Sequence, residues 1–228
     1  MRKLITITIA IVLTLTTYSQ KSVFSIGVGG SYDYHINEYT QTPWPWFDHQ
    51  YSNIFEFSLG SQFDIPIHNR LGIRTAISYS KKGYKLVYVW TTPDGGNGTD
   101  DAAIPMETQF KLKYIDIPLS VYYHIINKDR YKFGPSIGII NSINIANSEV
   151  SIMGNGNKKN TSYRTFRSTS YLYGARLGLI NNIDLNKKIF LSLEPYLIYN
   201  FSIINETDIQ KSDFAFGSYL SIHLRLNK

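Results

Sequence analysis

The sequence contains no cysteine, and this absence excludes several kinds of chemistry at once. A chain without thiols forms no disulfide, holds no thiolate zinc site and has no cysteine nucleophile. It also has no attachment point for the lipid of a lipoprotein. The absence of cysteine thus excludes thiol chemistry but does not indicate the cellular compartment of the protein.

Long hydrophobic runs and concentrated charge are missing as well. Hydrophobic residues make up 43%, yet mean hydropathy is −0.18 and no uninterrupted apolar run has the roughly 20 residues of a spanning helix. The net charge of +6 is diffuse, with no Lys/Arg-rich segment or nucleic-acid motif, so nucleic acid is excluded as a partner. The 228 residues suit one domain of the β-barrel kind.

The first residues have the pattern of a secretory signal peptide. Two basic residues, Arg2 and Lys3, precede an apolar, threonine-rich core over 4–15, and Thr17 and Ser19 supply the small residues before a cleavage site. The core is too short for a membrane span. We therefore expect residues 1–19 to be a signal peptide and residues 20–228 to form an exported barrel domain.

The stretch 214–226 carries the clearest structural signal. Its alternate positions are apolar or small: Phe214, Phe216, Ser218, Leu220, Ile222, Leu224 and Leu226. A period of two places these residues on one face of a strand, opposite a polar face. One face of such a strand suits hydrocarbon. In a membrane, only a closed barrel leaves no strand edge with unpaired backbone groups.

Seven further stretches resemble it, and the connections between them alternate in length. The eight predicted strands cover 23–34, 54–67, 70–90, 108–125, 131–145, 169–183, 189–201 and 214–226. Long connections at 35–53, 91–107, 148–166 and 204–212 alternate with tight turns, as in outer-membrane barrels with short periplasmic turns. The prediction is an all-β, single eight-stranded antiparallel up-and-down transmembrane β-barrel in the outer membrane, with both termini periplasmic.

Two of these strands change the phase of their apolar positions. The change falls near Gly83 in one strand and between Tyr114 and Ile115 in the next. The two changes lie at similar distances from the turn-side ends of their strands, which predicts a paired irregularity such as a β-bulge.

The face that lacks large apolar side chains carries acids and bases. Its charged residues are Glu56, Asp64, Arg74, Arg176, Glu194 and Arg225. Bare charges in a narrow lumen are costly unless paired, so these residues are predicted to form a structural charge network, with Asp64, Arg74 and Arg225 near the periplasmic end. An eight-stranded lumen is about filled by its own side chains, which argues against a wide pore.

The segment Lys113–Leu119, with the signal peptide and glycine-punctuated strands, resembles the PorT-like outer-membrane β-barrel (porin) family of Bacteroidota. Members often carry a Tyr-x-x-Ile-Pro-Leu segment here, and 193–196 is similar to the family's seventh strand. The resemblance covers nearly all of residues 20–228 and implies an eight-stranded barrel in the outer membrane. It transfers no catalytic residue. Named members assist protein secretion, while the terminal Leu226–Asn227–Lys228 departs from the common aromatic ending.

Few residues suggest a chemical site. The five histidines are scattered without metal-ligand spacing, so no metal or cofactor is expected. Ser221, His223 and Glu194 contain the groups of a hydrolase, but Ser221 and His223 point inward, away from lipid, and no catalytic residue is assigned. Trp44, Trp46 and Phe47 are a candidate contact surface in a loop; the alternative is packing onto the aromatic girdle.

The sequence favours a non-enzymatic, monomeric outer-membrane protein with a structural or interaction role. A narrow porin-like channel for small solutes is the alternative, and a lipid hydrolase or acyltransferase is the third hypothesis. The expected partners are outer-membrane lipid and lipopolysaccharide, the barrel-insertion machinery, and an envelope or secretion-complex protein at the surface loops or periplasmic turns.

Overall fold

The computed structural model describes residues 24–36, 47–53, 56–90, 105–153, 157–163, 171–201 and 213–226. Within these ranges the regular structure consists of strands: β1 (Phe24–Ile36), β2 (Phe47–Asn53), β3 (Glu56–Pro66), β4 (Leu71–Trp90), β5 (Pro105–Tyr123), β6 (Ile126–Asn127), β7 (Tyr131–Met153), β8 (Lys158–Tyr163), β9 (Tyr171–Asp184), β10 (Ile189–Asn200) and β11 (Asp213–Leu226). No helix in the described ranges combines the length and hydropathy needed to cross a membrane.

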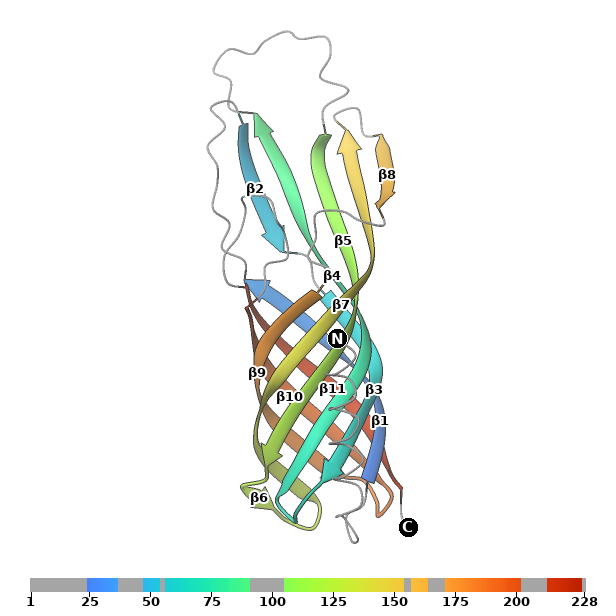
Figure 1. Cartoon of the computed structure of the whole chain (residues 1–228), viewed down its shortest axis with the longest axis vertical. Coiled ribbons are helices and arrows are strands. Elements are labelled where there is room, and N and C mark those ends of the chain that lie inside the picture. Colours follow the sequence, from blue (N-terminus) through green and yellow to red (C-terminus); the bar gives the residue numbers. More distant parts are fainter. Residues whose placement is uncertain are drawn as a thin grey trace.

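Eight of these strands close into a ring in which all neighbours are antiparallel. The order around the ring is β1, β3, β4, β5, β7, β9, β10 and β11, and β11 pairs with β1 from Leu226 opposite Phe24 to Phe214 opposite Ile36. Figure 1 shows the resulting barrel of tilted strands. The predicted fold class, an eight-stranded antiparallel up-and-down barrel, is confirmed.

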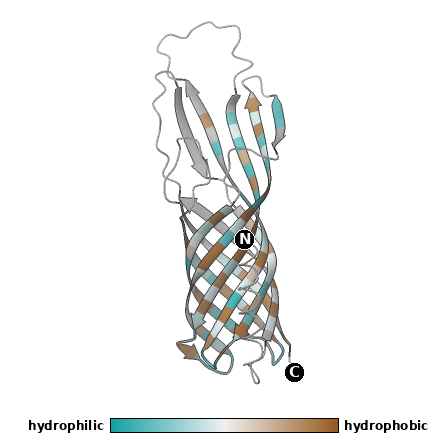
Figure 2. Ribbon diagram, in the orientation of Figure 1, coloured by the Kyte–Doolittle hydropathy of each residue, from teal (hydrophilic) through white to brown (hydrophobic). Residues whose placement is uncertain are grey.

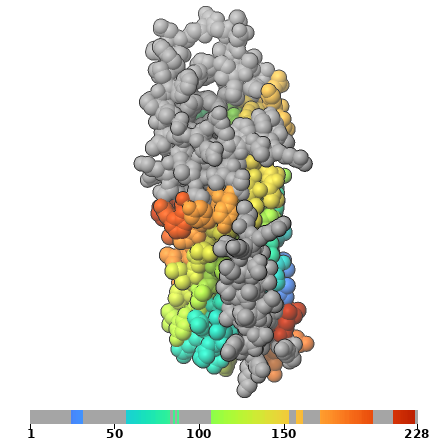
Figure 3. Space-filling view, in the orientation of Figure 1, coloured from blue at the N-terminus to red at the C-terminus, as the bar shows by residue number. Residues whose placement is uncertain are grey.

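The ring turns its apolar side chains outward, as a period of two predicts for a strand between lipid and a polar interior. Val28, Leu59, Ile137 and Leu220 are more than half exposed, whereas Glu194 on the opposite face is 1% exposed. Figure 2 shows apolar residues along the barrel strands, and Figure 3 shows one side of the outer wall. The outer wall of the barrel is therefore apolar, and its interior holds the buried charged side chains.

Short turns join the strands at one end of the barrel. In the turn 67–70, the amides of Ile67 and His68 both donate to Leu71 O at 2.9 Å. In the turn 185–188, the Asn186 side-chain oxygen accepts from the amides of Lys188 and Ile189 at 2.8 Å, as an Asx-turn does. These local bonds satisfy backbone groups that no neighbouring strand reaches.

At the other end, β4, β5 and β7 continue beyond the ring and carry two further strands. β2 pairs with the far part of β4, and β8 pairs with the far part of β7, which gives a five-stranded sheet in the order β2, β4, β5, β7, β8. We call this sheet the extension; it rises above the barrel in Figure 1. The expectation that 35–53 and 148–166 are loops throughout is wrong, because each range contains a strand of the extension.

The predicted irregularity shared by the third and fourth strands is also wrong. β4 and β5 keep one register from Leu71 opposite Tyr123 to Val87 opposite Glu107. Leu112 and Tyr114 are buried on the inward face, so the apolar residues change sides without any slip of the backbone. Register shifts occur instead between β5 and β7, at Lys113/Tyr114 and at Pro105/Glu107.

Candidate functional site: the barrel lumen

Arg74, on β4, is the centre of a charge network that crosses the lumen. Its Nη2 lies 2.7 Å from Asp64 Oδ2 on the neighbouring β3, and its Nη1 lies 3.3 Å from Glu194 Oε2 on β10. Nη1 also donates to Ser192 at 3.0 Å, and Nη2 to Asn182 at 3.3 Å. Because strands β4 and β10 stand on opposite parts of the ring, these bonds tie its two sides together across the middle.

Glu194 joins a second arginine to this network. Its Oε1 accepts from Ser136 at 3.1 Å and lies 3.5 Å from Arg176 Nη2. The guanidinium carbon of Arg176 stands 4.0 Å from the centre of the Tyr196 ring, a cation–π contact. Two arginines thus balance the carboxylates of Asp64 and Glu194, which a low-dielectric interior requires.

The structure brings together four of the six charged residues predicted for the lumen: Asp64, Arg74, Arg176 and Glu194. Arg225 is at the turn end of the barrel, where it pairs with Asp184 on β9 rather than with the network. Its guanidinium carbon lies 5.0 Å from the centre of the Phe190 ring. Glu56 begins β3, and its side chain lies outside the described part of the structure.

A buried ion pair between Lys82 and Asp116 was not predicted. Lys82 Nζ lies 3.4 Å from Asp116 Oδ1 and donates to Ser142 at 3.3 Å. The sequence held a signal, because Ile115 and Ile117 both suit the outer face and therefore turn Asp116 inward. Lys82 was missed because a phase change was expected next to it.

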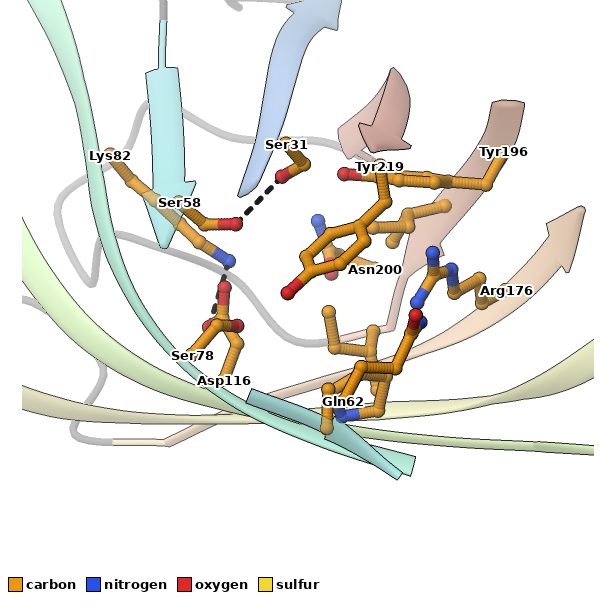
Figure 4. Close-up of a pocket in the computed structure, with 14 residues that line it drawn as sticks. Ser31, Ser58, Gln62, Ser78, Lys82, Asp116, Arg176, Tyr196, Asn200 and Tyr219 are labelled. Carbon is orange, nitrogen blue, oxygen red and sulfur yellow. Dashed lines mark hydrogen bonds and ion pairs between the residues drawn. The ribbon is translucent and has the colours of Figure 1, made fainter. Parts of the chain in front are cut away.

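These groups surround a small cavity, drawn in Figure 4, with a volume of about 20 Å³. That is room for about one water molecule. Arg176, Lys82 and Asp116 are among the residues that line it, and within the described residues Arg176 Nε and Nη2 have no hydrogen-bond partner. The cavity is polar but narrow.

Apolar layers fill the lumen beside this cavity. One cluster consists of Ile140, Tyr196, Ile198, Ala215 and Tyr219. A second, next to the extension, consists of Leu112, Tyr114 and Leu172, of which Tyr114 is fully buried. Ion pairs at one level and packed side chains at others leave the described interior without a wide passage.

Inward glycines make room for large side chains on neighbouring strands. A Cβ on Gly27 would lie 2.7 Å from three atoms of the His223 ring, and a Cβ on Gly72 would lie 2.2 Å from the Tyr122 hydroxyl. That hydroxyl donates to Asp64 at 2.6 Å. These glycines are therefore part of the packing and do not widen a channel.

Ser221 and His223 lie in contact, but in a fully buried cluster. His223 Nε2 is 2.9 Å from Ser221 Oγ and 2.9 Å from Gln62 Oε1. The other ring nitrogen, Nδ1, which an orienting acid contacts in a triad, lies 3.4 Å from the Ser25 hydroxyl, while Glu194 is bound by Ser136 and arginines. The arrangement lacks the base-activating carboxylate of a catalytic triad.

Two titratable groups outside the ring of spanning strands are shifted. Burial lowers the pKa of His124, in the turn after β5, to about 4, against an opposing effect of Asp64. On the extension, hydrogen bonds from Lys85 and then Gln109 lower the pKa of the Glu107 carboxyl. Both shifts follow from burial or pairing and accompany no cluster of reactive groups.

No group of three or more potential metal ligands occurs among the described residues. Trp44 and Trp46 lie outside those residues, and Phe47 begins β2 with its side chain outside them. The candidate aromatic contact surface thus stays a prediction.

An apolar outer wall around a closed, ion-paired interior defines an outer-membrane type of β-barrel. The comparison with known families agrees: residues 18–208 match the family described as outer membrane protein beta-barrel domain, and the chain belongs to it. The family places the chain in the outer membrane. No curated protein matches the chain.

Solved outer-membrane proteins with a TM-score above 0.5 share this fold at low sequence identity. The outer membrane protein OprG from Pseudomonas aeruginosa is 9% identical, with a TM-score of 0.54, over 91% of this chain and 97% of that chain. A major outer membrane protein from Thermus thermophilus is 13% identical, with a TM-score of 0.52, over 91% of this chain and 100% of that chain. The attachment invasion locus protein Ail of Yersinia pestis is 10% identical, with a TM-score of 0.45, over 91% of this chain and 100% of that chain.

Proposed function

We propose that this chain is a non-enzymatic, monomeric outer-membrane protein in which the barrel is an anchor and the extension is the part that contacts partners. The observation that carries the proposal is the contrast between the two ends of the molecule. The lumen is crossed by ion pairs and filled by side chains, whereas β4, β5 and β7 continue past the ring to form a separate sheet.

In this proposal the turn end faces the periplasm and the extension faces the outside, as short turns and long connections indicate. An amino-terminal signal peptide delivers the chain, and the barrel-insertion machinery places it. The resemblance of Lys113–Leu119 to PorT-like proteins of Bacteroidota supports an envelope or secretion-complex protein as the partner. The periplasmic turns offer that partner a second surface.

Trimming the extension tests this assignment. Replacing residues 84–109 by an Asn-Gly turn leaves the ring pairs from Leu71–Tyr123 to Lys82–Leu112 in place. We expect the trimmed protein to show the same heat-modifiable migration from membrane fractions as the full chain. A photo-crosslinking residue at exposed Lys159 should lose its crosslinked partner in the trimmed protein, since β8 belongs to the same sheet.

Position Leu220, on the lipid-facing side of β11, is the control site for the crosslinker. Identical crosslinked species from both sites, or from full and trimmed proteins, contradict a role for the extension. Recovery of the full chain as a soluble periplasmic protein contradicts the anchor.

A narrow channel for small solutes is the second candidate. It is favoured by one observation, the polar cavity into which Arg176, Lys82 and Asp116 project. The cavity holds about one water molecule, and the Arg74 ion pairs cross the lumen. Conduction of a solute therefore requires these ion pairs to separate. Bilayer conductance distinguishes the two candidates.

A further inference from the structure

Three lysines share the outward face of β4 and β5 at the level where the apolar wall ends. Lys81 on β4 is directly opposite Lys113 on β5, and Lys111 is directly opposite Gly83. Directly opposed residues point to the same side of a sheet, so the three ammonium groups belong to one surface. We call Lys81, Lys111 and Lys113 the lysine row.

The lysine row marks a sharp boundary along these two strands. The preceding outward pair is Tyr79 opposite Ile115, and Ile77 before it is 55% exposed. Lys81 Nζ lies 5.0 Å from the centre of the Phe57 ring on β3. An aromatic ring beside a lysine whose stem extends from the apolar band is typical of the interface between hydrocarbon and headgroups.

None of the three lysines has an acidic partner within the described structure. The nearby pairs are made by other lysines: Lys85 Nζ is 2.6 Å from Glu107 Oε2, and Lys82 turns inward to Asp116. Like charges placed directly opposite each other destabilise a sheet, so Lys81 and Lys113 weaken the isolated protein. An anion bound on this face would remove that repulsion.

The neighbours of the lysine row leave space for such an anion. Lys113 is opposite Ala146 on β7, and Lys111 lies between Gly83 on β4 and Ser148 on β7. These are small residues that cannot cover the ammonium groups. The row is therefore an open basic surface just above the apolar wall and next to the extension.

We propose that the lysine row binds the phosphate groups of a phosphorylated glycolipid, of the lipopolysaccharide type, in the outer leaflet. The proposal rests on the orientation given above, with the extension outside. Ammonium groups pair with phosphate oxygens through charge-assisted hydrogen bonds. The lysine row lies at the level where the apolar wall ends, which is the level of anionic headgroups at the membrane interface. The lipid's acyl chains would then lie along Ile77, Ile115 and the residues below them.

The test compares the full chain with Lys81→Gln/Lys111→Gln/Lys113→Gln in neutral detergent micelles. We expect the variant to be as stable as the wild type or more stable without lipid, because like-charge repulsion is gone. Bisphosphorylated lipid A should raise the melting temperature of the wild type and bind the variant at least about tenfold more weakly. The wild type then becomes the more stable protein as lipid is added.

Lys128→Gln/Lys187→Gln/Lys188→Gln is the matched control, because these exposed lysines lie at the turn end and removing them changes the net charge equally. It should bind lipid A like the wild type, as should the triple Lys→Arg variant of the row. Dephosphorylated lipid A and inorganic phosphate should have little effect.

Equal lipid affinity of the row variant and the wild type overturns the proposal, and so does equal weakening by the control variant. A shift produced by inorganic phosphate alone overturns the assignment to a lipid. If the triple variant fails to fold, Lys111→Gln and Lys113→Gln are measured singly. Heat-modifiable migration of the wild type, recorded in the same samples, reports separately on the barrel.

Discussion

Arg74 is the residue on which the order of the lumen depends most. It contacts groups on three other strands, β3, β9 and β10, and its side chain is 3% exposed. A pair of this kind contributes little net stability compared with apolar packing, but removing one partner leaves a buried charge without compensation. Its loss is therefore a severe test of the network.

Arg74→Ala should lower the free energy of unfolding by about 3–5 kcal/mol, since it removes the arginine paired with Asp64 and one of the two arginines paired with Glu194. The measurement is urea unfolding in detergent micelles, followed by heat-modifiable gel migration. Adding Asp64→Asn and Glu194→Gln should recover part of the loss, while Lys128→Ala in an exposed turn should be near neutral. A loss under about 1 kcal/mol from Arg74→Ala contradicts the network's role.

Single residues show where sequence reasoning succeeds and where it stops. The inward placement of Asp64, Arg74 and Glu194 follows from a period of two. Which partners they take does not, because Arg225 is equally inward and pairs with Asp184. Two inward side chains can pair only if they lie at the same level along the barrel axis. That level depends on strand tilt and on the register of every strand between them.

At the scale of the element, the β4–β5 hairpin shows how composition can imitate a structural irregularity. Apolar residues move from odd to even positions near Gly83 in β4 and between Ile115 and Tyr114 in β5, which suggests a bulge from sequence alone. The strands in fact keep their register, and the environment of each face changes instead. Toward the extension the outward face carries lysines and Glu107, while Leu112 and Tyr114 fill the inside of the barrel.

Strands β1 and β11 pack through a glycine that accommodates an imidazole, and this contact predicts a coupled effect. Gly27→Ala should destabilise the barrel by about 1–3 kcal/mol, because the added methyl meets the His223 ring. Paired with His223→Ala, it should cost clearly less than the sum of the single changes. A double-mutant cycle of unfolding free energies measures this coupling.

Additive effects within about 0.3 kcal/mol contradict a direct contact between the two positions. Val28→Ala is the comparison for the same strand, since Val28 faces outward and is 61% exposed. Its change should be independent of His223. A period of two places Gly27 on the inward face, but its contact with a large side chain depends on the β1–β11 register.

The whole molecule consists of a barrel whose lumen is crossed by ion pairs and a sheet that extends above it. The ring follows from eight alternating stretches and the tight turns between them. The extension was not predicted, because β2 and β8 are short, polar strands that form only where β4 and β7 offer an edge. Short strands of this composition have little intrinsic preference of their own.

Planar-bilayer recordings test the seal. We expect the folded wild type to be electrically silent, because ion pairs and the Tyr114 and Tyr196 layers occupy the cross-section. Single-channel events from the wild type support the channel instead, most clearly if Glu194→Gln increases their frequency by loosening Arg74. Lys187→Gln, at the exposed turn end, is the control for a nonspecific change of charge.

The pairing of β1 with β11 joins the beginning of the described chain to its end. A partly synthesised chain therefore has two open margins, and in hydrocarbon each exposed amide or carbonyl is penalised by several kcal/mol. Stepwise insertion of one hairpin at a time is thus unfavourable. Because β11 closes the ring by pairing with β1, we expect the chain to stay out of hydrocarbon until β11 is available for that pairing.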